Sequence, residues 1–118
     1  MTKFYHNGIE VNKWLLSGVI EKKEDIELGD GRVYTEIILL QRSRGFGTGF
    51  RISRYMIQAW QQRLRKFIKN KVPVGTEVCV EGRMRSNSYK NEADEWSHFT
   101  VLELANVLPN IGGKSGND

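Results

Sequence analysis

Cations and an aromatic ring recur with a period of two in the stretch from Val78 to Tyr89. Arg83, Arg85 and Tyr89 share one parity, while the apolar residues of the other parity are Val78, Val80 and Met84. A period of two is typical of a strand with one buried face, and the apolar parity predicts the buried side. Arginine binds phosphate and an aromatic ring stacks on a base, so the opposite face is suited to nucleic acid.

A second group of cations and rings surrounds a glycine-rich segment, residues 43–49. The candidates there are Arg42, Arg44 and Phe46, followed in the next expected strand by Phe50, Arg51 and Tyr55. Binding of single strands without regard to sequence needs a positive groove and exposed rings, because every base offers a face for stacking. The five arginines of both groups are predicted phosphate contacts, although a merely solvated surface gives the same pattern.

The alternative for each ring is burial in a core. Trp14 and Trp60 are expected in the core, because strand parity and helical spacing account for them. Tyr89 lies beyond the apolar period among polar neighbours, which favours contact with a ligand. For Phe46 and Tyr55 both interpretations stay open.

The sequence offers little for catalysis. His6 and His98 are isolated, and the single cysteine, Cys79, lies within an expected strand. No His, Cys or carboxylate cluster has the spacing of metal ligands, so we expect no enzyme, no metal and no cofactor. One cysteine excludes an internal disulfide and agrees with a reducing compartment, which predicts a cytosolic protein.

The length of the chain favours a single domain, and its positive charge favours binding to polyanions. The chain has 118 residues, with 18 Lys and Arg against 14 Asp and Glu, for a net charge of +4. No apolar run reaches the roughly 20 residues that span a bilayer, and residues 1–10 do not resemble a signal peptide. We expect one domain over residues 1–110 and a disordered, glycine-rich tail over residues 111–118.

Five strands and one helix are predicted from the hydrophobic periodicity. The strands are residues 11–22, which are apolar on both parities, then 32–42, 50–55, the stretch from 78, and 96–108. A helix is predicted over residues 57–70, because one helical face carries Ile57, Trp60, Leu64, Phe67 and Ile68. An acidic turn, residues 24–31, joins the first two strands, and its carboxylates should keep phosphates away.

Three strands, a helix and two strands is the element order of the OB-fold. We therefore predict an all-β, five-stranded OB-fold barrel with one α-helix between strands three and four. The second and third strands of such barrels and their adjoining loops commonly bind oligonucleotides. Fold alone does not settle function, since OB barrels also bind proteins and sugars.

Two segments carry a family resemblance. Residues 81–89, Glu-Gly-Arg-Met-Arg-Ser-Asn-Ser-Tyr, follow Val74-Gly75-Thr76-Glu77-Val78, and residues 12–19 read Asn-Lys-Trp-Leu-Leu-Ser-Gly-Val. They resemble the Glu-Gly-x-Leu-Arg-Thr-x-x-aromatic segment and the opening strand, Asn-x-hydrophobic-x-hydrophobic-x-Gly, of the bacterial and phage single-stranded DNA-binding protein family. The resemblance spans roughly residues 11–109, and only these two segments are specific.

The resemblance implies largely sequence-independent, non-catalytic binding of single-stranded DNA in replication, recombination or repair. By position, Phe46, Phe50 or Tyr55, and Tyr89 resemble the family's stacking rings. It also implies a homo-oligomer, with a tetramer favoured and a dimer possible, in the cytosol of a bacterium or a phage-infected cell. Family members often end in an acidic tip that docks replication proteins, and this sequence predicts no such docking.

Two other functions remain open at this point. One is a primosome-like or RNA-binding OB-fold protein, which would use the same rings and cations. The other is an OB-fold protein-interaction module in which the aromatic rings are buried and the positive charge is incidental.

Overall fold

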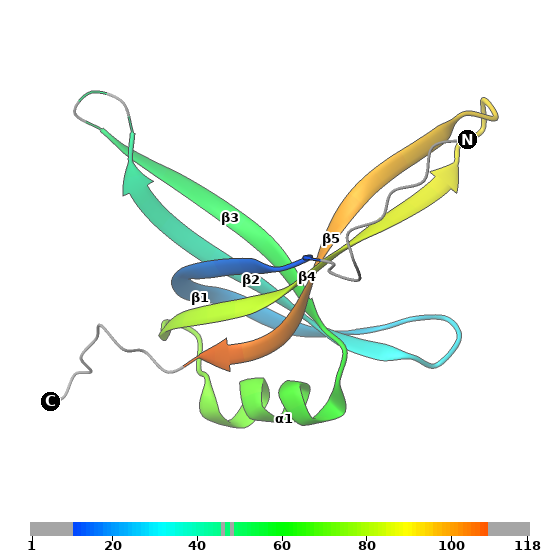
Figure 1. The fold of residues 1–118 in the computed structure, drawn as a ribbon. Helices are drawn as coiled ribbons and strands as arrows, with labels where there is room; N and C mark the ends of the chain where they lie inside the picture. The colour runs from blue at the N-terminus through cyan, green and yellow to red at the C-terminus, as the bar shows by residue number, and fades with distance from the viewer. Residues whose placement is uncertain (1–10, 46, 48, 109–118) are drawn as a thin grey trace, which may run out of the picture.

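The protein is an OB-fold barrel in a computed structural model that describes residues 11–45, 47 and 49–108. Its strands are β1 (Trp14–Glu27), β2 (Val33–Arg44), β3 (Phe50–Ala59), β4 (Glu77–Lys90) and β5 (Trp96–Leu108), and its helix is α1 (Gln62–Lys71). The strands close in the order β1-β2-β3-β5-β4, with β3 and β5 parallel and every other pair antiparallel (Figure 1). The predicted fold class, the placement of one helix between strands three and four and the predicted bounds of β5 are confirmed.

Two hairpins extend beyond the barrel as ribbons that diverge from each other (Figure 1). β3 pairs with β5 only at Ile57 and Gln58, but it pairs with β2 out to Phe50. β4 pairs with β1 only as far as Gly82, but it pairs with β5 out to Lys90. We call these ribbons the β2–β3 arm (residues 41–56) and the β4–β5 arm (residues 83–101).

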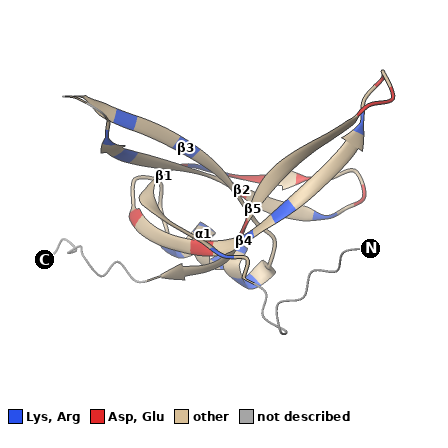
Figure 2. Ribbon diagram, turned by 45° about the horizontal axis from the view of Figure 1, so that its top comes forward, with Lys and Arg blue, Asp and Glu red and all other residues tan. Residues whose placement is uncertain are grey.

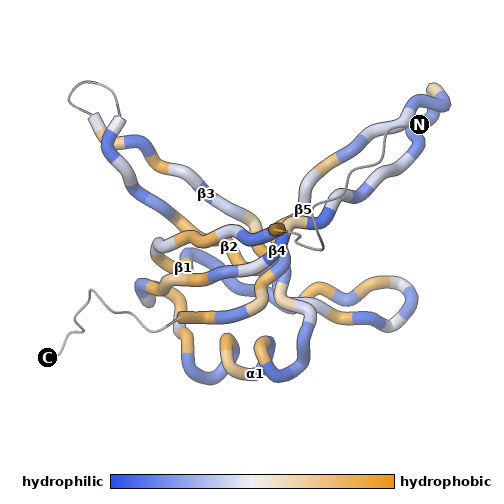
Figure 3. The backbone as a smooth tube through the Cα atoms, in the orientation of Figure 1, coloured by the Kyte–Doolittle hydropathy of each residue, from blue (hydrophilic) through white to orange (hydrophobic). Residues whose placement is uncertain are grey.

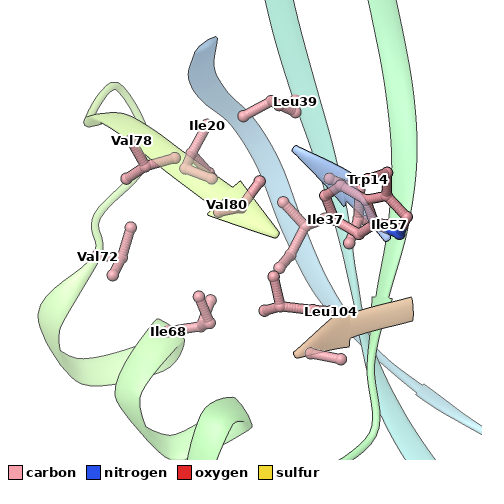
Figure 4. Packing of buried hydrophobic residues seen from close by; sticks show 11 residues of the cluster. Trp14, Ile20, Ile37, Leu39, Ile57, Ile68, Val72, Val78, Val80 and Leu104 are labelled. Carbon is pink, nitrogen blue, oxygen red and sulfur yellow. The ribbon is translucent and has the colours of Figure 1, made fainter. Parts of the chain in front are cut away.

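The core lies inside the barrel, between its strands and α1 (Figure 4). Alternate residues of the strands point inward, and the cluster consists of Trp14, Ile20, Ile37, Leu39, Ile57, Ala59, Ile68, Val72, Val78, Val80 and Leu104. Apolar residues gather in the barrel, while the arms are mostly polar (Figure 3). The prediction that Trp14 is a core residue is confirmed, and its Nε1 donates a hydrogen bond to the carbonyl of Arg83 at 2.9 Å.

The predicted helix over residues 57–70 starts too early. The structure continues β3 to Ala59 and begins the helix at Gln62. Ile57 is buried through strand parity, and Trp60 is only half-buried and lies outside the core cluster. Their spacing matches a helical face by coincidence, because a strand end and a helix start follow each other within three residues. Phe67 does lie on α1, but 44% of it is exposed.

Four strands are longer than or shifted from their predicted bounds. β1 runs to Glu27, so the first half of the predicted acidic turn is strand, and residues 28–32 form the turn. β2 extends to Arg44 and β3 to Ala59. β4 continues through the position of Tyr89, so this residue does not lie beyond the strand.

Two apolar side chains that were expected inside are exposed. Met84 has the inward parity, yet it is 48% exposed because β4 leaves the barrel after Gly82. Leu15 is 60% exposed, so β1 packs on one side only within the chain. The predicted tail, residues 111–118, lies outside the described residues.

The acidic segment of β1 continues as strand because its inward-pointing side chains find polar partners. Lys23 Nζ donates to the carbonyls of Ile68 at 2.9 Å, Lys69 at 3.2 Å and Val72 at 2.8 Å. A cation at the last carbonyls of a helix satisfies their acceptors and complements the helix dipole. The hydroxyl of Thr35 donates to Asp25 at 2.8 Å. The three bonds from Lys23 fix the end of α1 against the barrel, away from both arms.

Candidate nucleic-acid interface

A groove of about 530 Å³ lies between the β1–β2 hairpin, the end of β3 and the β4–β5 arm. The first hairpin contributes Leu28, Arg32 and Tyr34; the end of β3 and the residue after it contribute Gln58 and Trp60; β4 and β5 contribute Arg85, Asn87, Phe99 and Glu103. Aromatic, cationic and amide groups thus converge on the outer surface of the barrel.

An aromatic platform forms one wall of the groove. The rings of Tyr34 and Trp60 lie 4.7 Å apart between centroids, with planes tilted by 31°. The guanidinium of Arg32 lies 5.6 Å from the ring of Trp60, and Trp60 Nε1 donates to Gln58 Oε1 at 2.8 Å. Tyr34 has the outward parity of β2, opposite to buried Thr35 and Ile37, so its ring is available on the surface side.

Arg85 organises the floor of the groove. Its Nε donates to Glu103 Oε2 at 2.6 Å, its Nη2 donates to Gln58 Oε1 at 3.2 Å, and its Nη1 donates to Asn87 Oδ1. The guanidinium is therefore paired with a carboxylate and two amides. An arginine in this state offers little net charge to a phosphate, so the floor is polar and nearly neutral.

The β4–β5 arm extends this surface outward. Its register places Asn87 opposite Phe99 and Tyr89 opposite Ser97, so Arg83, Arg85 and Tyr89 share one face of the arm. Tyr89 is 53% exposed, and its ring meets Phe99 edge-on with centroids 6.1 Å apart. The common face that strand parity predicts for the two arginines and the tyrosine is present.

The outward face of β3 connects the groove with the β2–β3 arm. Gln58 lies at the groove, and the same parity continues through Met56, Arg54, Ile52 and Phe50, of which Met56, Ile52 and Phe50 are large exposed hydrophobics. Arg42 lies over the ring of Phe50, with 4.7 Å from its guanidinium carbon to the ring centroid. Arg44 pairs with Phe50 across the two strands. A chain laid along this face meets exposed apolar side chains and, at the outer end, the ring of Phe50 with Arg42 over it.

Two of the predicted candidates lie elsewhere, and one cannot be placed. Arg51 has the parity opposite to Phe50, so it lies on the other face of the β2–β3 arm. Tyr55 is half-buried and packs against the core cluster. Phe46 lies outside the described residues. The predicted set is therefore split between the two arms, and of its members that the structure describes only Arg85 lines the groove.

Two acidic residues, Asp30 in the turn before β2 and Glu21 on β1, are paired with arginines. The backbone N–H and then the side chain of Arg32 donate to Asp30, at 3.0 and 2.7 Å, and these bonds lower the pKa of the Asp30 carboxyl. Arg54 makes two hydrogen bonds to Glu21, which lower the pKa of the Glu21 carboxyl. Lys and Arg are spread along both arms, whereas Asp and Glu gather at the tips of the β1–β2 and β4–β5 hairpins (Figure 2).

Eight of the nine residues that line the groove are absent from the predicted set, among them Arg32, Tyr34, Gln58, Trp60 and Phe99. Strand parity predicts that Tyr34 lies on the outer face of β2, since it alternates with the buried residues of that strand. Asn87 and Phe99 are equally far from the turn at residues 91–95, so a regular hairpin makes them partners. The positions of Trp60 and Gln58 depend on where β3 ends, and the sequence gives no signal for that.

The described residues show no group of three or more His, Cys, Asp or Glu that could hold a metal ion. Within the same residues, no helix is long and apolar enough to cross a membrane.

No family model and no curated protein sequence matches this chain. Solved structures with similar folds include single-stranded DNA-binding proteins. The Plasmodium falciparum protein, solved in complex with single-stranded DNA, has a TM-score of 0.65 at 16% identity, over 84% of this chain and 90% of that chain. The mitochondrial protein Rim1 of S. cerevisiae has a TM-score of 0.67 at 17% identity, over 89% of this chain and 100% of that chain. Its selenomethionine form scores 0.64 at 17% identity.

Proposed function

We propose that this chain binds single-stranded DNA without catalysis and largely without regard to sequence. The observation that carries the proposal is the continuous outward surface from the Tyr34–Trp60 platform along β3 to Arg42 and Phe50. Each end of this surface carries an exposed ring system with an arginine beside it, Trp60 with Arg32 and Phe50 with Arg42. Exposed rings combined with cations suit sequence-tolerant binding of a flexible strand. The likeness of the fold to two single-stranded DNA-binding proteins supports the same assignment.

A titration that compares three nucleic acids tests this function. We expect tryptophan fluorescence to report tight binding of oligo-dT, weaker binding of oligo-rU and little binding of a duplex of equal length. Equal affinity for the duplex would refute the proposal. A preference for oligo-rU would support an RNA-binding function instead, and absence of any response would support a protein-interaction module.

The cations of the β2–β3 arm are proposed to contact phosphates. Because one lost phosphate contact removes about 0.7 from the slope of log affinity against log salt, Arg42→Ala should flatten the measured slope by about that amount. Lys66→Ala, on α1 away from the arms, removes the same charge and should leave the slope unchanged. An unchanged slope in Arg42→Ala would remove this arm from the phosphate path.

A homo-oligomer is part of the proposal, with a tetramer favoured and a dimer possible. Within the described residues, Trp14–Gly18 pair with β4 alone, and their other edge receives only a side-chain hydrogen bond from Gln41 to Ser17 O at 3.1 Å. Leu15 is exposed beside this edge. An open strand edge with an apolar neighbour pairs readily with a second copy. Light scattering at micromolar concentration should give a multiple of the 13.6 kDa chain mass, and a monomeric mass would refute it.

The family resemblance of residues 12–19 and 81–89 also leads us to propose a role in replication, recombination or repair. We place the protein in the cytosol of a bacterium or a phage-infected cell, with the family resemblance of residues 12–19 and 81–89 as support.

A further inference from the structure

We propose that the groove reads the edge of one base and prefers a base with an exocyclic amino group over thymine. This inference rests on the proposed function and adds to it a single selective position among contacts that accept any base. Gln58, Asn87 and Glu103 accept hydrogen bonds from Arg85, and we call these four side chains the Arg85 network. The inference depends on the donor and acceptor atoms that this network leaves unused.

The network fixes which way its two amides point. Trp60 Nε1 and the guanidinium of Arg85 can only donate, so the amide oxygen of Gln58 must accept both bonds. The amide oxygen of Asn87 likewise accepts from Arg85. Among the described residues neither amide nitrogen donates a hydrogen bond, so Gln58 Nε2 and Asn87 Nδ2 are donors left for a ligand.

Glu103 supplies the opposite polarity. Its Oε2 accepts from Arg85 Nε at 2.6 Å, whereas its Oε1 accepts no hydrogen bond within the described part of the chain. Only 29% of its side chain is exposed, which limits the access of competing water. The groove therefore presents one charged acceptor and two amide donors beside an aromatic wall.

A base with an exocyclic amine meets this arrangement better than thymine does. Cytosine directs its amine to a carboxylate and offers its ring nitrogen and carbonyl oxygen to amide donors. Thymine carries a carbonyl oxygen in place of the amine, and its single ring N–H is flanked by two carbonyl oxygens. Turning that N–H toward Glu103 brings both oxygens near the carboxylate, which repels them.

The walls of the groove can hold such a base. Phe99 and the Tyr34–Trp60 pair supply stacking faces, and a groove of about 530 Å³ is within the range of small-molecule sites. The nearly neutral floor, in which Arg85 is paired with Glu103, favours a base over a phosphate at this position.

Two oligonucleotides of equal length test the inference, one of thymine and one of 5-methylcytosine, because these bases differ only in the oxygen or amine at position 4 and the ring proton beside it. Above neutral pH, where cytosine is uncharged, the parent should bind the 5-methylcytosine strand about tenfold more tightly. In Glu103→Gln the amide oxygen keeps the bond from Arg85 and an NH₂ group replaces the acceptor. The preference should therefore reverse toward thymine.

Glu77→Gln is the matched control, because it removes the same charge from an exposed position at the far end of β4 and should keep the parental preference. Circular dichroism melting confirms that each variant is folded. Equal binding of both strands by the parent, or a parental preference for thymine, would overturn base reading while leaving single-strand binding intact. Failure to bind either strand would instead refute the proposed function.

Discussion

Replacing Trp60 by alanine should weaken binding of oligo-dT by about five- to 150-fold, which corresponds to the roughly 1–3 kcal/mol that one stacking ring contributes. Trp60 is the largest ring that lines the groove, and it stacks on Tyr34 with centroids 4.7 Å apart. Its loss removes one face for a base and leaves Tyr34 without its neighbour. Equilibrium binding by fluorescence anisotropy of a labelled strand measures this effect without relying on the protein's own tryptophans.

Two variants separate stacking from general damage to the fold. Trp60→Phe keeps a ring at the same position, so it should retain most of the affinity. Phe67→Ala removes another partly exposed ring, on α1 away from the arms, and should leave the affinity unchanged. If Trp60→Ala bound oligo-dT like the parent, the strand would not pass over the platform and the binding surface would be confined to the arms.

Substitution of Gly82 by alanine should cost about 3 kcal/mol of unfolding free energy, at the upper end of what overpacking typically costs. Gly82 lies where β4 passes from β1 to the β4–β5 arm, and the indole of Trp14 crosses it to reach the carbonyl of Arg83. A Cβ at this position would overlap the carbonyl oxygen of Glu103 and lie 2.5 Å from Trp14 Cζ2. Both obstacles are held by the barrel itself, so neither can move without disturbing the core.

Urea denaturation measures the loss at Gly82, and Gly29→Ala is the matched control. Gly29 lies in the first turn, where a Cβ would have no atom within 4 Å, and its φ is not positive, so the substitution should be almost neutral. A Gly82→Ala protein as stable as the parent would show that β4 and β5 can separate at this point, and that the glycine is not required for the close approach of the strands.

Sequence periodicity predicted the barrel because its strongest signals come from local physics. The apolar alternation of Val78 and Val80 predicts the strand β4. The Asp30-Gly31 pair predicts the turn between β1 and β2. Neither prediction needs information from the rest of the chain. Trp60 shows where such signals fail, since its spacing from Leu64 is helical although β3 ends beside it. Burial by the other strands, rather than local propensity, decides where β3 stops.

The binding surface was predictable only in part for a related reason. Parity placed Arg83, Arg85 and Tyr89 on one face, but it could not show that Arg85 is paired with Glu103, because their contact depends on the register of β4 against β5. Arg85 is a predicted phosphate contact, and in the structure its guanidinium donates to Glu103, Gln58 and Asn87 at the floor of the groove. Likewise, parity separates Tyr55 from Phe50, and the closed barrel then turns Tyr55 against the core.

Photocrosslinking shows directly where on the protein a bound strand lies. A single-stranded oligonucleotide that contains 5-iododeoxyuridine forms covalent bonds with aromatic side chains in contact with the base, and peptide mapping identifies them. We expect crosslinks to Tyr34, Trp60 or Phe99 around the groove, with further crosslinks to Phe50 along the β2–β3 arm. Crosslinks confined to Phe67 on α1, with none at the groove or the arms, would contradict this prediction.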